Sequence, residues 1–549
     1  MDAAELKRDK KRGRDLRRNG LREPYDVIVV GGGHNGLVTA AYLAAGGVRT
    51  LVLERRQILG GACVTEEVFP GFHFSTLSYI CAMLRPAIVG DLELERRGFE
   101  ILPCDPAVLV PFEDGRSLAL WDDAERTRAE ISKFSTRDAD TYEEMQEQFA
   151  RIGRFLAQMI DRTPPSPSLR RPADAWYVLR LAGRFRGLDR ADRDTLIQLM
   201  TASVQDFLDE RFETDAVKAA LAASAAIGMA SGPRTPGTAF VMLHYSVGGG
   251  ESSWGFMRGG MGTITQGMAE ACRERGVELR TGVEITEIRS QKGRVRGVTL
   301  ANGEEIDAPV VVSNADPKRT FLSLVDRRQI DPDYLRGIKS FQMTGTSAKV
   351  NLALSDLPEF TCRPGTPSDA HTGTTEIACS LRNLEDGWDS CKNGQIAESP
   401  CCEVVFPTVR DGTLAPAGKH ILSASVQYVP YELADGDWDA RREELGDRVI
   451  DTIATYAPSI RDVILHRQIL TPLDLEREYG LTNGNKYHGD LNLAQMFIMR
   501  PVMGWARYRT PIDGLYLCGA GTHPGPGVMG AAGRNAAGEI LRDRLWKKR

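Results

Sequence analysis

The chain has 549 residues, 42% of them hydrophobic and 26% charged, with a formal net charge of −5 and a pI near 6.0. This length exceeds one ordinary hydrophobic core, so we expect two or more domains. The net charge gives no sign of a nucleic-acid partner. No apolar run reaches the roughly 18 residues that can span a bilayer, so we do not expect an integral membrane protein.

The first 20 residues are highly charged and contain no apolar segment, which predicts a disordered basic arm. No apolar stretch follows Arg17-Arg18, which argues against a secretory signal, and acidic residues interrupt the pattern of a mitochondrial presequence. The ten cysteines are scattered without a C-x-x-C motif, so we expect free thiols, no zinc site and no redox dithiol. These features predict a cytoplasmic protein, or a mitochondrial one if the source is eukaryotic.

The strongest local pattern is a dinucleotide-binding unit near the N-terminus. A buried strand is expected at 27–30, a small-residue helix at 37–46 and a second strand at 50–53. The first strand leads into a G-x-G-x-x-G motif formed by Gly31, Gly33 and Gly36. Such glycines let the backbone approach a pyrophosphate at the helix N-terminus, and Glu54 stands where an acid accepts hydrogen bonds from a ribose.

The next block, residues 87–254, has a mainly helical pattern. Within it, residues 173–190 combine aromatic and aliphatic side chains with four arginines, which is typical of a helix packed on its own domain or of one lying on a membrane surface. The alanine-rich segment 216–230 is expected to be a buried helix or the wall of an apolar tunnel.

A third unit spans Gly259 to Pro317 and should contain a helix at 263–275, short strands, and a hairpin around Asn302-Gly303. Gly260 and Gly262 do not follow a buried strand, so we expect no second dinucleotide fingerprint and no NAD(P)H domain. Residues 340–430 predict an antiparallel sheet, residues 438–456 a charged helix, and residues 471–492 an irregular segment.

The C-terminal region repeats the theme of strand, glycine-rich loop and helix. A strand at 514–518 precedes five glycines and a helix expected from about 531 to 545. Two helix N-termini of this kind suit a long anionic cofactor that is held along its length.

The segments GGGHNGLVTAAYL…LERR…GGACVTEE, VVVSNADP and LYLCGAGTHPGPGVMGAAGRNAA together resemble flavoproteins of the phytoene desaturase type. The similarity runs from about residue 25 to residue 540. It implies FAD as cofactor and an α/β fold: a discontinuous Rossmann-like FAD-binding domain with a second α+β substrate domain. The implied segments are a basic arm (1–20), the FAD-binding domain (21–86, 255–320 and 495–549), a helical cap (87–254) and a substrate domain with an antiparallel sheet (321–494).

The resemblance also implies which residues meet the cofactor. The glycines of the first motif would meet the pyrophosphate, Glu54 the adenosine ribose, the backbone of Val283 the adenine, and the turn Gly527–Gly530 the flavin pyrimidine edge. The implied cofactor-binding residues are Gly31, Gly33, His34, Asn35, Gly36, Glu54, Arg55, Gly60, Gly61, Ala62, Val283, Gly519, Gly521, Gly527, Val528, Met529 and Gly530. No metal site is expected, because no histidine pair has metal-binding spacing.

Two positions depart from the amine oxidase pattern within this broad group. Ala62 stands where many amine oxidases place an arginine, and Ala520-Gly521 where they tend to carry an acid. We therefore expect an FAD-dependent oxidoreductase that dehydrogenates an apolar polyene- or lipid-like substrate, with O2 or a quinone as electron acceptor. His523 is the candidate catalytic residue, with a loop histidine bonded to backbone as its alternative.

Alternative functions are a flavin-dependent double-bond isomerase, a flavin-bound interaction protein with weak redox activity, and an amine oxidase.

Overall fold

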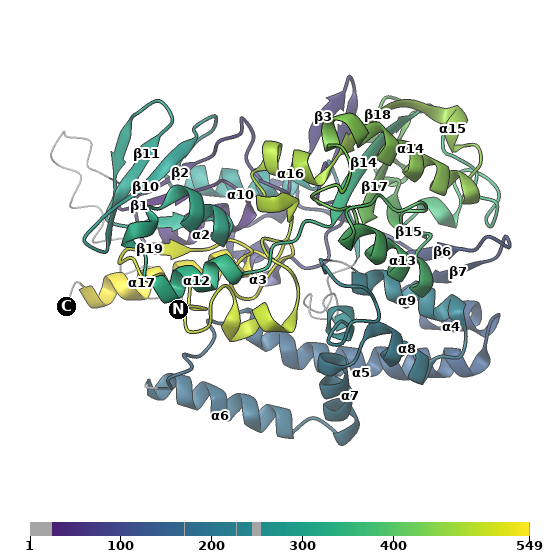
Figure 1. Cartoon of the computed structure of the whole chain (residues 1–549), viewed down its shortest axis with the longest axis horizontal. Helices are drawn as coiled ribbons and strands as arrows, with labels where there is room; N and C mark the ends of the chain where they lie inside the picture. Colours follow the sequence, from purple (N-terminus) through teal and green to yellow (C-terminus); the bar gives the residue numbers. More distant parts are fainter. Residues whose placement is uncertain (1–24, 170, 227, 244–253, 548–549) are drawn as a thin grey trace.

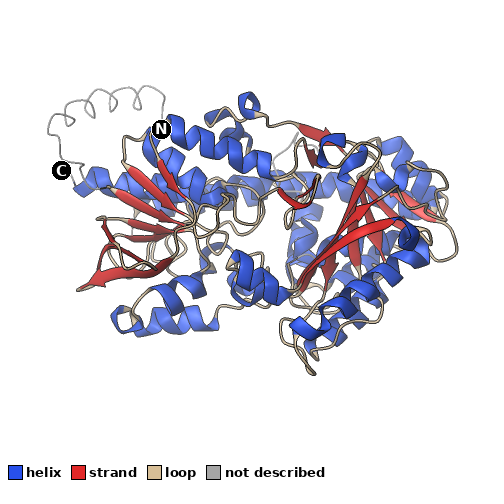
Figure 2. Ribbon diagram, turned by 90° about the horizontal axis from the view of Figure 1, so that it is seen from above, coloured by secondary structure: helices blue, strands red, loops and turns tan. Residues whose placement is uncertain are grey.

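The computed structural model describes residues 25–169, 171–226, 228–243 and 254–547. The basic arm predicted for residues 1–20 lies outside the described residues. Figure 1 shows the parallel sheet with its helices at the left and the long antiparallel strands at the right. Figure 2, the same molecule from above, shows these two sheets on opposite sides with helices and loops between them.

The first sheet is parallel and is assembled from three distant parts of the chain. Its strands, in spatial order, are β19 (Leu515–Leu517), β13 (Val311–Ser313), β1 (Val27–Val30), β2 (Thr50–Leu53) and β9 (Glu278–Arg280). Ile28 pairs with Val311, which in turn pairs with Leu515. The discontinuous Rossmann-like domain is therefore confirmed.

Both faces of this sheet are covered, as continuous apolar strands require. On one face Val27 and Val29 pack against three helices, and on the other Ile28 and Val30 pack against a small antiparallel sheet and the helical segment 317–340. The helices of the first face are α2 (His34–Ala45), α10 (Gly262–Glu274) and α17 (Ala531–Lys547). The second face carries β10 (Ile285–Gln291), β11 (Arg294–Leu300), β12 (Glu305–Asp307), α11 (Pro317–Arg319) and α12 (Pro332–Ser340).

The second sheet has seven strands and belongs to the substrate domain. Their order is β18 (Ile464–Leu470), β14 (Ser347–Leu354), β17 (His420–Gln427), β16 (Cys402–Val405), β15 (Thr374–Ile377), β6 (Val108–Pro111) and β7 (Ser117–Leu120). Neighbouring strands run antiparallel except β15 and β6. One face packs its apolar side chains against α14 (Trp438–Tyr456), the helix predicted at these residues.

Helices fill most of the block from 87 to 254, as predicted, but three strands in it were missed. β5 (Ile101–Pro103) pairs with β8 (Gly255–Met257), and the hairpin β6–β7 extends the substrate-domain sheet. The hairpin turn contains Asp114-Gly115, a sequence that favours tight turns. The helices of this block are α3 (Pro86–Asp91), α4 (Ala124–Ser132), α5 (Thr136–Ile160), α6 (Pro172–Arg186), α7 (Arg190–Thr201), α8 (Val204–Arg211) and α9 (Asp215–Ala226).

The segment 471–492 was predicted to be irregular, and this is wrong for its first part. α16 (Pro472–Tyr479) begins there with a capping box, in which the Thr471 hydroxyl accepts from the Asp474 amide while the Asp474 carboxylate accepts from the Thr471 amide. The remaining elements are the hairpin β3 (Glu66–Phe69) and β4 (Phe72–Phe74), and the helices α13 (Leu381–Lys392) and α15 (Ile460–Val463). Within the described residues, no helix is both long and apolar enough to cross a membrane.

Candidate functional site

One elongated cleft runs from the carboxyl ends of the parallel strands to the seven-stranded sheet. Its walls come from all three FAD-domain segments and from the substrate domain. The predicted site residues that line it are Gly31, Gly33, His34, Asn35, Glu54, Arg55, Gly60, Gly61, Ala62, Val283, Gly527 and Val528. The structure thus brings together residues that lie up to 497 positions apart, from 31 to 528.

The turn between β1 and α2 approaches the cleft as bare backbone. Gly31 has a φ of +96°, a conformation that favours glycine. A Cβ on Gly33 would lie 2.8 Å from Asn314 Nδ2, and one on Gly36 would collide with the Gly31 carbonyl oxygen. α2 begins without a side-chain cap at Gly33, so its first amides are available to an anion in the cleft.

Glu54 ends β2 with a buried carboxylate that already has two backbone partners. The Gly32 amide donates to Oε2 at 2.8 Å and the Arg56 amide to Oε1 at 2.9 Å. These bonds fix the carboxylate at the edge of the cleft. Because a carboxylate can accept about four hydrogen bonds, both oxygens keep capacity for ribose hydroxyl groups.

The paired glycines let a second segment pass beside the first turn. Gly60 forms a bridge with Gly33 and has a φ of +129°, and a Cβ there would lie 2.5 Å from the Cys63 carbonyl oxygen. Gly61 has a φ of +62°. Ala62, which replaces the arginine of many amine oxidases, leaves only a methyl group at this part of the cleft wall.

Arg55 lines the cleft but also joins the two domains. Its guanidinium donates to the carbonyl oxygens of Arg477 at 2.9 Å and Glu478 at 2.6 Å, at the C-terminal end of α16. A cation at the carbonyl end of a helix is favourable. Arg55 therefore anchors α16 beside the cleft, a role that the sequence did not indicate.

Of the two backbone groups of Val283 that could pair with adenine, the amide is already used within the protein. The Val283 amide donates to the Glu54 carbonyl oxygen at 2.9 Å, which leaves the carbonyl group of Val283 to meet a base. Its neighbours Glu284 and Ile285 line the same wall.

Four of the C-terminal residues predicted to touch the cofactor lie behind the cleft instead. A Cβ on Gly519 would lie 2.7 Å from the Asn314 carbonyl oxygen, and one on Gly530 would lie 2.6 Å from Ile88 Cδ1. Gly521 packs in the same way on Pro317, and Met529 lines a neighbouring apolar cavity. These glycines permit close packing of the loop, and Gly527 and Val528 line the cleft together with Ala520 and Pro526.

Arg500 organises the loop on the opposite wall, and sequence reasoning missed it. The side chain is 0% exposed, and its guanidinium donates to the backbone carbonyl oxygens of Ala520, Tyr487, His488, Gly489, Asp490 and Gln495. These bonds hold the loop 487–490 against the C-terminal segment.

Two histidines that line the cleft have unsatisfied ring nitrogens. His34 Nε2 and His488 Nδ1 are buried and have no hydrogen-bond partner among the described residues. Burial lowers the pKa of both rings, and the pKa of His34 falls to about 4, so both are neutral near pH 7. Buried polar atoms of this kind need a partner, which a bound cofactor would supply.

His523 does not lie in the cleft. Its Nε2 is 2.9 Å from the Met159 carbonyl oxygen, and the ring forms one wall of the small apolar cavity beside the Gly527–Met529 loop. Burial lowers its pKa to about 4. The loop histidine bonded to backbone is thus what the structure shows.

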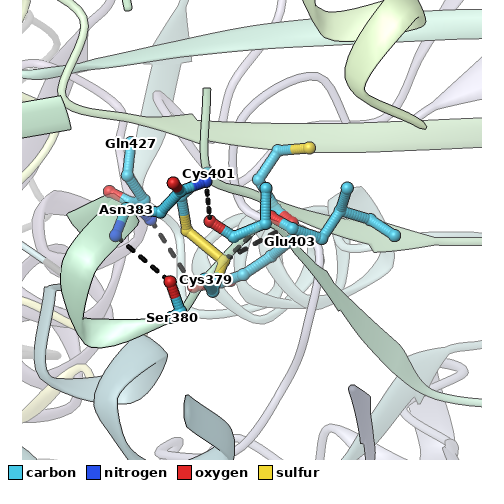
Figure 3. Close-up of a disulfide and its surroundings, with 9 residues drawn as sticks. Cys379, Ser380, Asn383, Cys401, Glu403 and Gln427 are labelled. Carbon is cyan, nitrogen blue, oxygen red and sulfur yellow. Dashed lines mark hydrogen bonds between the residues drawn. A yellow bond between two sulfur atoms is a disulfide. The ribbon is translucent and has the colours of Figure 1, made fainter. Parts of the chain in front are cut away.

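The expectation that all cysteines are free is wrong for one pair. Cys379 and Cys401 form a disulfide with a Cα–Cα distance of 5.0 Å, while the other eight cysteines are free. Antiparallel pairing of Ile377 with Cys402 brings the two residues together across 22 positions of sequence. Figure 3 shows the disulfide beside Glu403 and Gln427, and Gln427 lines the cleft.

The glycine cradle, the uncapped start of α2, the positioned Glu54 carboxylate and the unpartnered histidines fit a dinucleotide that bears a pyrophosphate and a ribose. Comparisons with known proteins agree. The family model described as flavin containing amine oxidoreductase matches residues 36–541.

Among curated relatives, pyridine nucleotide-disulfide oxidoreductase domain-containing protein 2 of Mus musculus is 39% identical over 548 residues, covering 95% of this chain and 94% of its own length. A limonene dehydrogenase component of Castellaniella defragrans is 28% identical, covering 95% and 96%. A lycopene-forming phytoene desaturase of Pseudescherichia vulneris is 24% identical, covering 94% and 99%.

A solved structure of putrescine oxidase bound to putrescine superposes with a TM-score of 0.60 at 15% identity, covering 95% of this chain and 99% of that one. At this identity the match shows the fold alone. The expected resemblance to FAD-dependent oxidoreductases of this broad group is confirmed, and phytoene desaturases are distant relatives within it. The chain therefore belongs to the family of flavin-containing amine oxidoreductases, and it is an FAD-dependent oxidoreductase.

Proposed function

We propose that this protein dehydrogenates an apolar, polyene- or lipid-like substrate. The observation that carries the proposal is a small cavity beside the Gly527–Met529 loop, which shares Met83 with the cofactor cleft. Among the residues that the structure describes, every side chain that lines it apart from His523 is apolar: Met83, Leu156, Met159, Ile160, Phe240, Leu243, Leu491, Met496, Phe497, Pro524 and Met529.

Such a cavity favours a hydrocarbon over a charged amine, because an amine would lose its hydration there without gaining a counter-charge. Bound FAD supplies a two-electron acceptor for a hydride. The chain contributes a dry wall that excludes water and orients the substrate. Two relatives are named for limonene and phytoene, which are both hydrocarbons.

The test is anaerobic mixing of the FAD-loaded protein with a panel of terpenes, polyenes, fatty acyl compounds and primary amines. We expect the absorbance of oxidised flavin to bleach with apolar compounds and not with amines. Bleaching by amines alone would contradict the proposal. Product that is lighter by two hydrogens supports dehydrogenation, whereas product of unchanged mass would show isomerisation. Reoxidation with air or a quinone then identifies the electron acceptor.

If no compound bleaches the flavin and the dithionite-reduced protein reoxidises with neither air nor a quinone, a role as a flavin-bound interaction protein replaces the enzymatic one.

We also propose that α6 rests on an anionic lipid bilayer that supplies the substrate. Trp176 and Leu179 are 69% and 66% exposed, whereas Leu181 and Phe185 on the opposite side pack against the helical core. The exposed Arg180, Arg184 and Arg186 complement anionic headgroups. Figure 1 shows α6 at the lower edge of the molecule.

Replacing both apolar residues with glutamate should reduce co-sedimentation with phosphatidylserine vesicles by about tenfold or more, because burying each side chain contributes about 1.5–3 kcal/mol. Met503→Glu is the matched control, since Met503 is 63% exposed elsewhere on the surface. Equal sedimentation of both variants would contradict membrane docking.

A further inference from the structure

A row of buried polar side chains crosses one face of the seven-stranded sheet. Lys349 of β14 pairs with Ser425 of β17, Ser425 with Glu403 of β16, and Glu403 with Glu376 of β15. Directly paired residues project from the same face of a sheet. All four are at most 5% exposed. The opposite face is apolar and packs on α14, so this row faces the interior between the two domains.

Within the part of the chain that the structure describes, Lys349 is a member of the row that lacks a hydrogen-bond partner for its side chain. It is 2% exposed, and its Nζ has no hydrogen-bond partner among the described residues. The Nζ lies 4.0 Å from the ring centre of Tyr79, and Tyr79 lines the cofactor cleft. Burial lowers the pKa of Lys349 well below its usual range. A buried amine without a partner costs free energy unless a ligand satisfies it.

A second amine approaches the same region from Lys486, the residue that precedes the loop 487–490 held by Arg500. Lys486 lines the cleft, and its Nζ donates to Ser425 Oγ at 3.2 Å. It is close enough to Lys349 that its charge contributes to the lowered pKa of Lys349. Burial also lowers the pKa of Lys486 itself, to about 8. A bound anion would stabilise both ammonium groups at once.

We propose that Lys349 and Lys486 form a subsite that binds a carboxylate at the end of an apolar substrate. The inference rests on the proposed function and narrows it, because it requires the apolar substrate to carry an acidic head. Leu470 pairs with Lys349 on its other side and packs in one cluster with Leu77 and Leu481, which both line the cleft. The amines thus lie at the end of an apolar wall.

The two carboxyl groups of the row do not make this a site for a cation. Burial raises the pKa of Glu403 to about 7 and that of Glu376 to about 8, so near neutral pH Glu376 is mostly protonated and Glu403 is about half ionised, with its charge opposed by that of Lys486. Among the described residues, Lys486, Gln427 and Tyr79 line the cleft, whereas Lys349, Glu403 and Glu376 do not, and Lys349 lies against the ring of Tyr79. Of these three lining residues, Lys486 is the one that carries a charge to the cleft.

The test measures binding without turnover. The FAD-loaded protein is titrated with decanoate, decanol and acetate, and the perturbation of the flavin absorbance gives each affinity. We expect decanoate to bind about tenfold or more tightly than decanol, since hydrogen bonds to charged groups are stronger than neutral ones. In Lys349→Met this preference should fall to within about threefold, and Lys349→Arg should retain it.

Lys339→Met, at an exposed lysine of α12, is the control and should leave the preference unchanged. Flavin content and melting temperature show whether each variant is folded. A preference that survives in Lys349→Met, or no preference in the unaltered protein, would overturn the subsite. Acetate binding as tightly as decanoate would overturn the assignment to an apolar acid. None of these results would contradict the proposed dehydrogenation, because that proposal is tested separately by flavin bleaching.

Discussion

The two large sheets of this molecule use their surfaces in opposite ways. The parallel sheet buries apolar side chains on both faces and presents its chemistry at the strand ends, through glycine backbone and the carboxylate of Glu54. The seven-stranded sheet buries one apolar face and carries the polar row from Lys349 to Glu376 on the other. The cofactor side therefore depends on backbone geometry, and the substrate side depends on strand register.

Adding a single methyl group to the glycine turn of the parallel sheet should strongly weaken FAD binding. In Gly36→Ala the new Cβ collides with the Gly31 carbonyl oxygen. Overpacking costs about 1–3 kcal/mol, and displaced amides lose charged hydrogen bonds of about 1.5–3 kcal/mol each. We expect FAD affinity to fall by about 100- to 1,000-fold, measured by flavin titration of the apoprotein.

Gly90→Ala is the control for this change, because nothing lies within 4 Å of the added Cβ. It should retain full flavin content with unchanged or slightly raised stability. If Gly36→Ala binds FAD as tightly as Gly90→Ala does, the turn is not the pyrophosphate cradle.

A substitution in the seven-stranded sheet should lower the stability of the protein without changing its affinity for FAD. Replacing Cys379 and Cys401 with serine removes a crosslink that closes a loop of 22 residues. We expect the free energy of unfolding to fall by about 3 kcal/mol, measured by denaturant titration, while flavin content stays constant. Cys362→Ser, at a partly exposed free thiol, controls for the substitution itself. Loss of flavin in the double variant would show that the two sheets are not separable in this way.

This difference also explains what the sequence could predict. Gly31, Gly33, Gly36 and Glu54 lie within 24 residues and form their cradle locally, so their spacing alone indicates a dinucleotide site. The row of Lys349, Ser425, Glu403 and Glu376 depends on pairing between strands that are far apart in the sequence. Nothing local marks those residues as neighbours.

Arg500 and the disulfide escaped prediction for the same reason, since their partners are set by tertiary contacts. The hairpin at Asp114-Gly115 and the capping box at Thr471 are different, because their signals were present in the sequence and were outweighed by the surrounding pattern.

The expected effect that is smallest per measured step concerns pH, at about 1 kcal/mol for each pH unit, and it tests whether the polar row is buried. Burial raises the pKa of Glu376 from 4.5 to about 8. The folded state then binds the proton more tightly than the unfolded state, so this carboxyl stabilises the fold at low pH and loses that contribution as pH rises from 4.5 towards 8. In Glu376→Gln the stability relative to the unaltered protein should increase by about 1 kcal/mol per pH unit across this window and level off above it. Denaturant unfolding at several pH values measures this slope. Glu270→Gln, at an exposed position of α10, should show none. A flat difference for Glu376→Gln would mean that water reaches the row, and that the seven-stranded sheet does not keep a dry polar face beside the cleft.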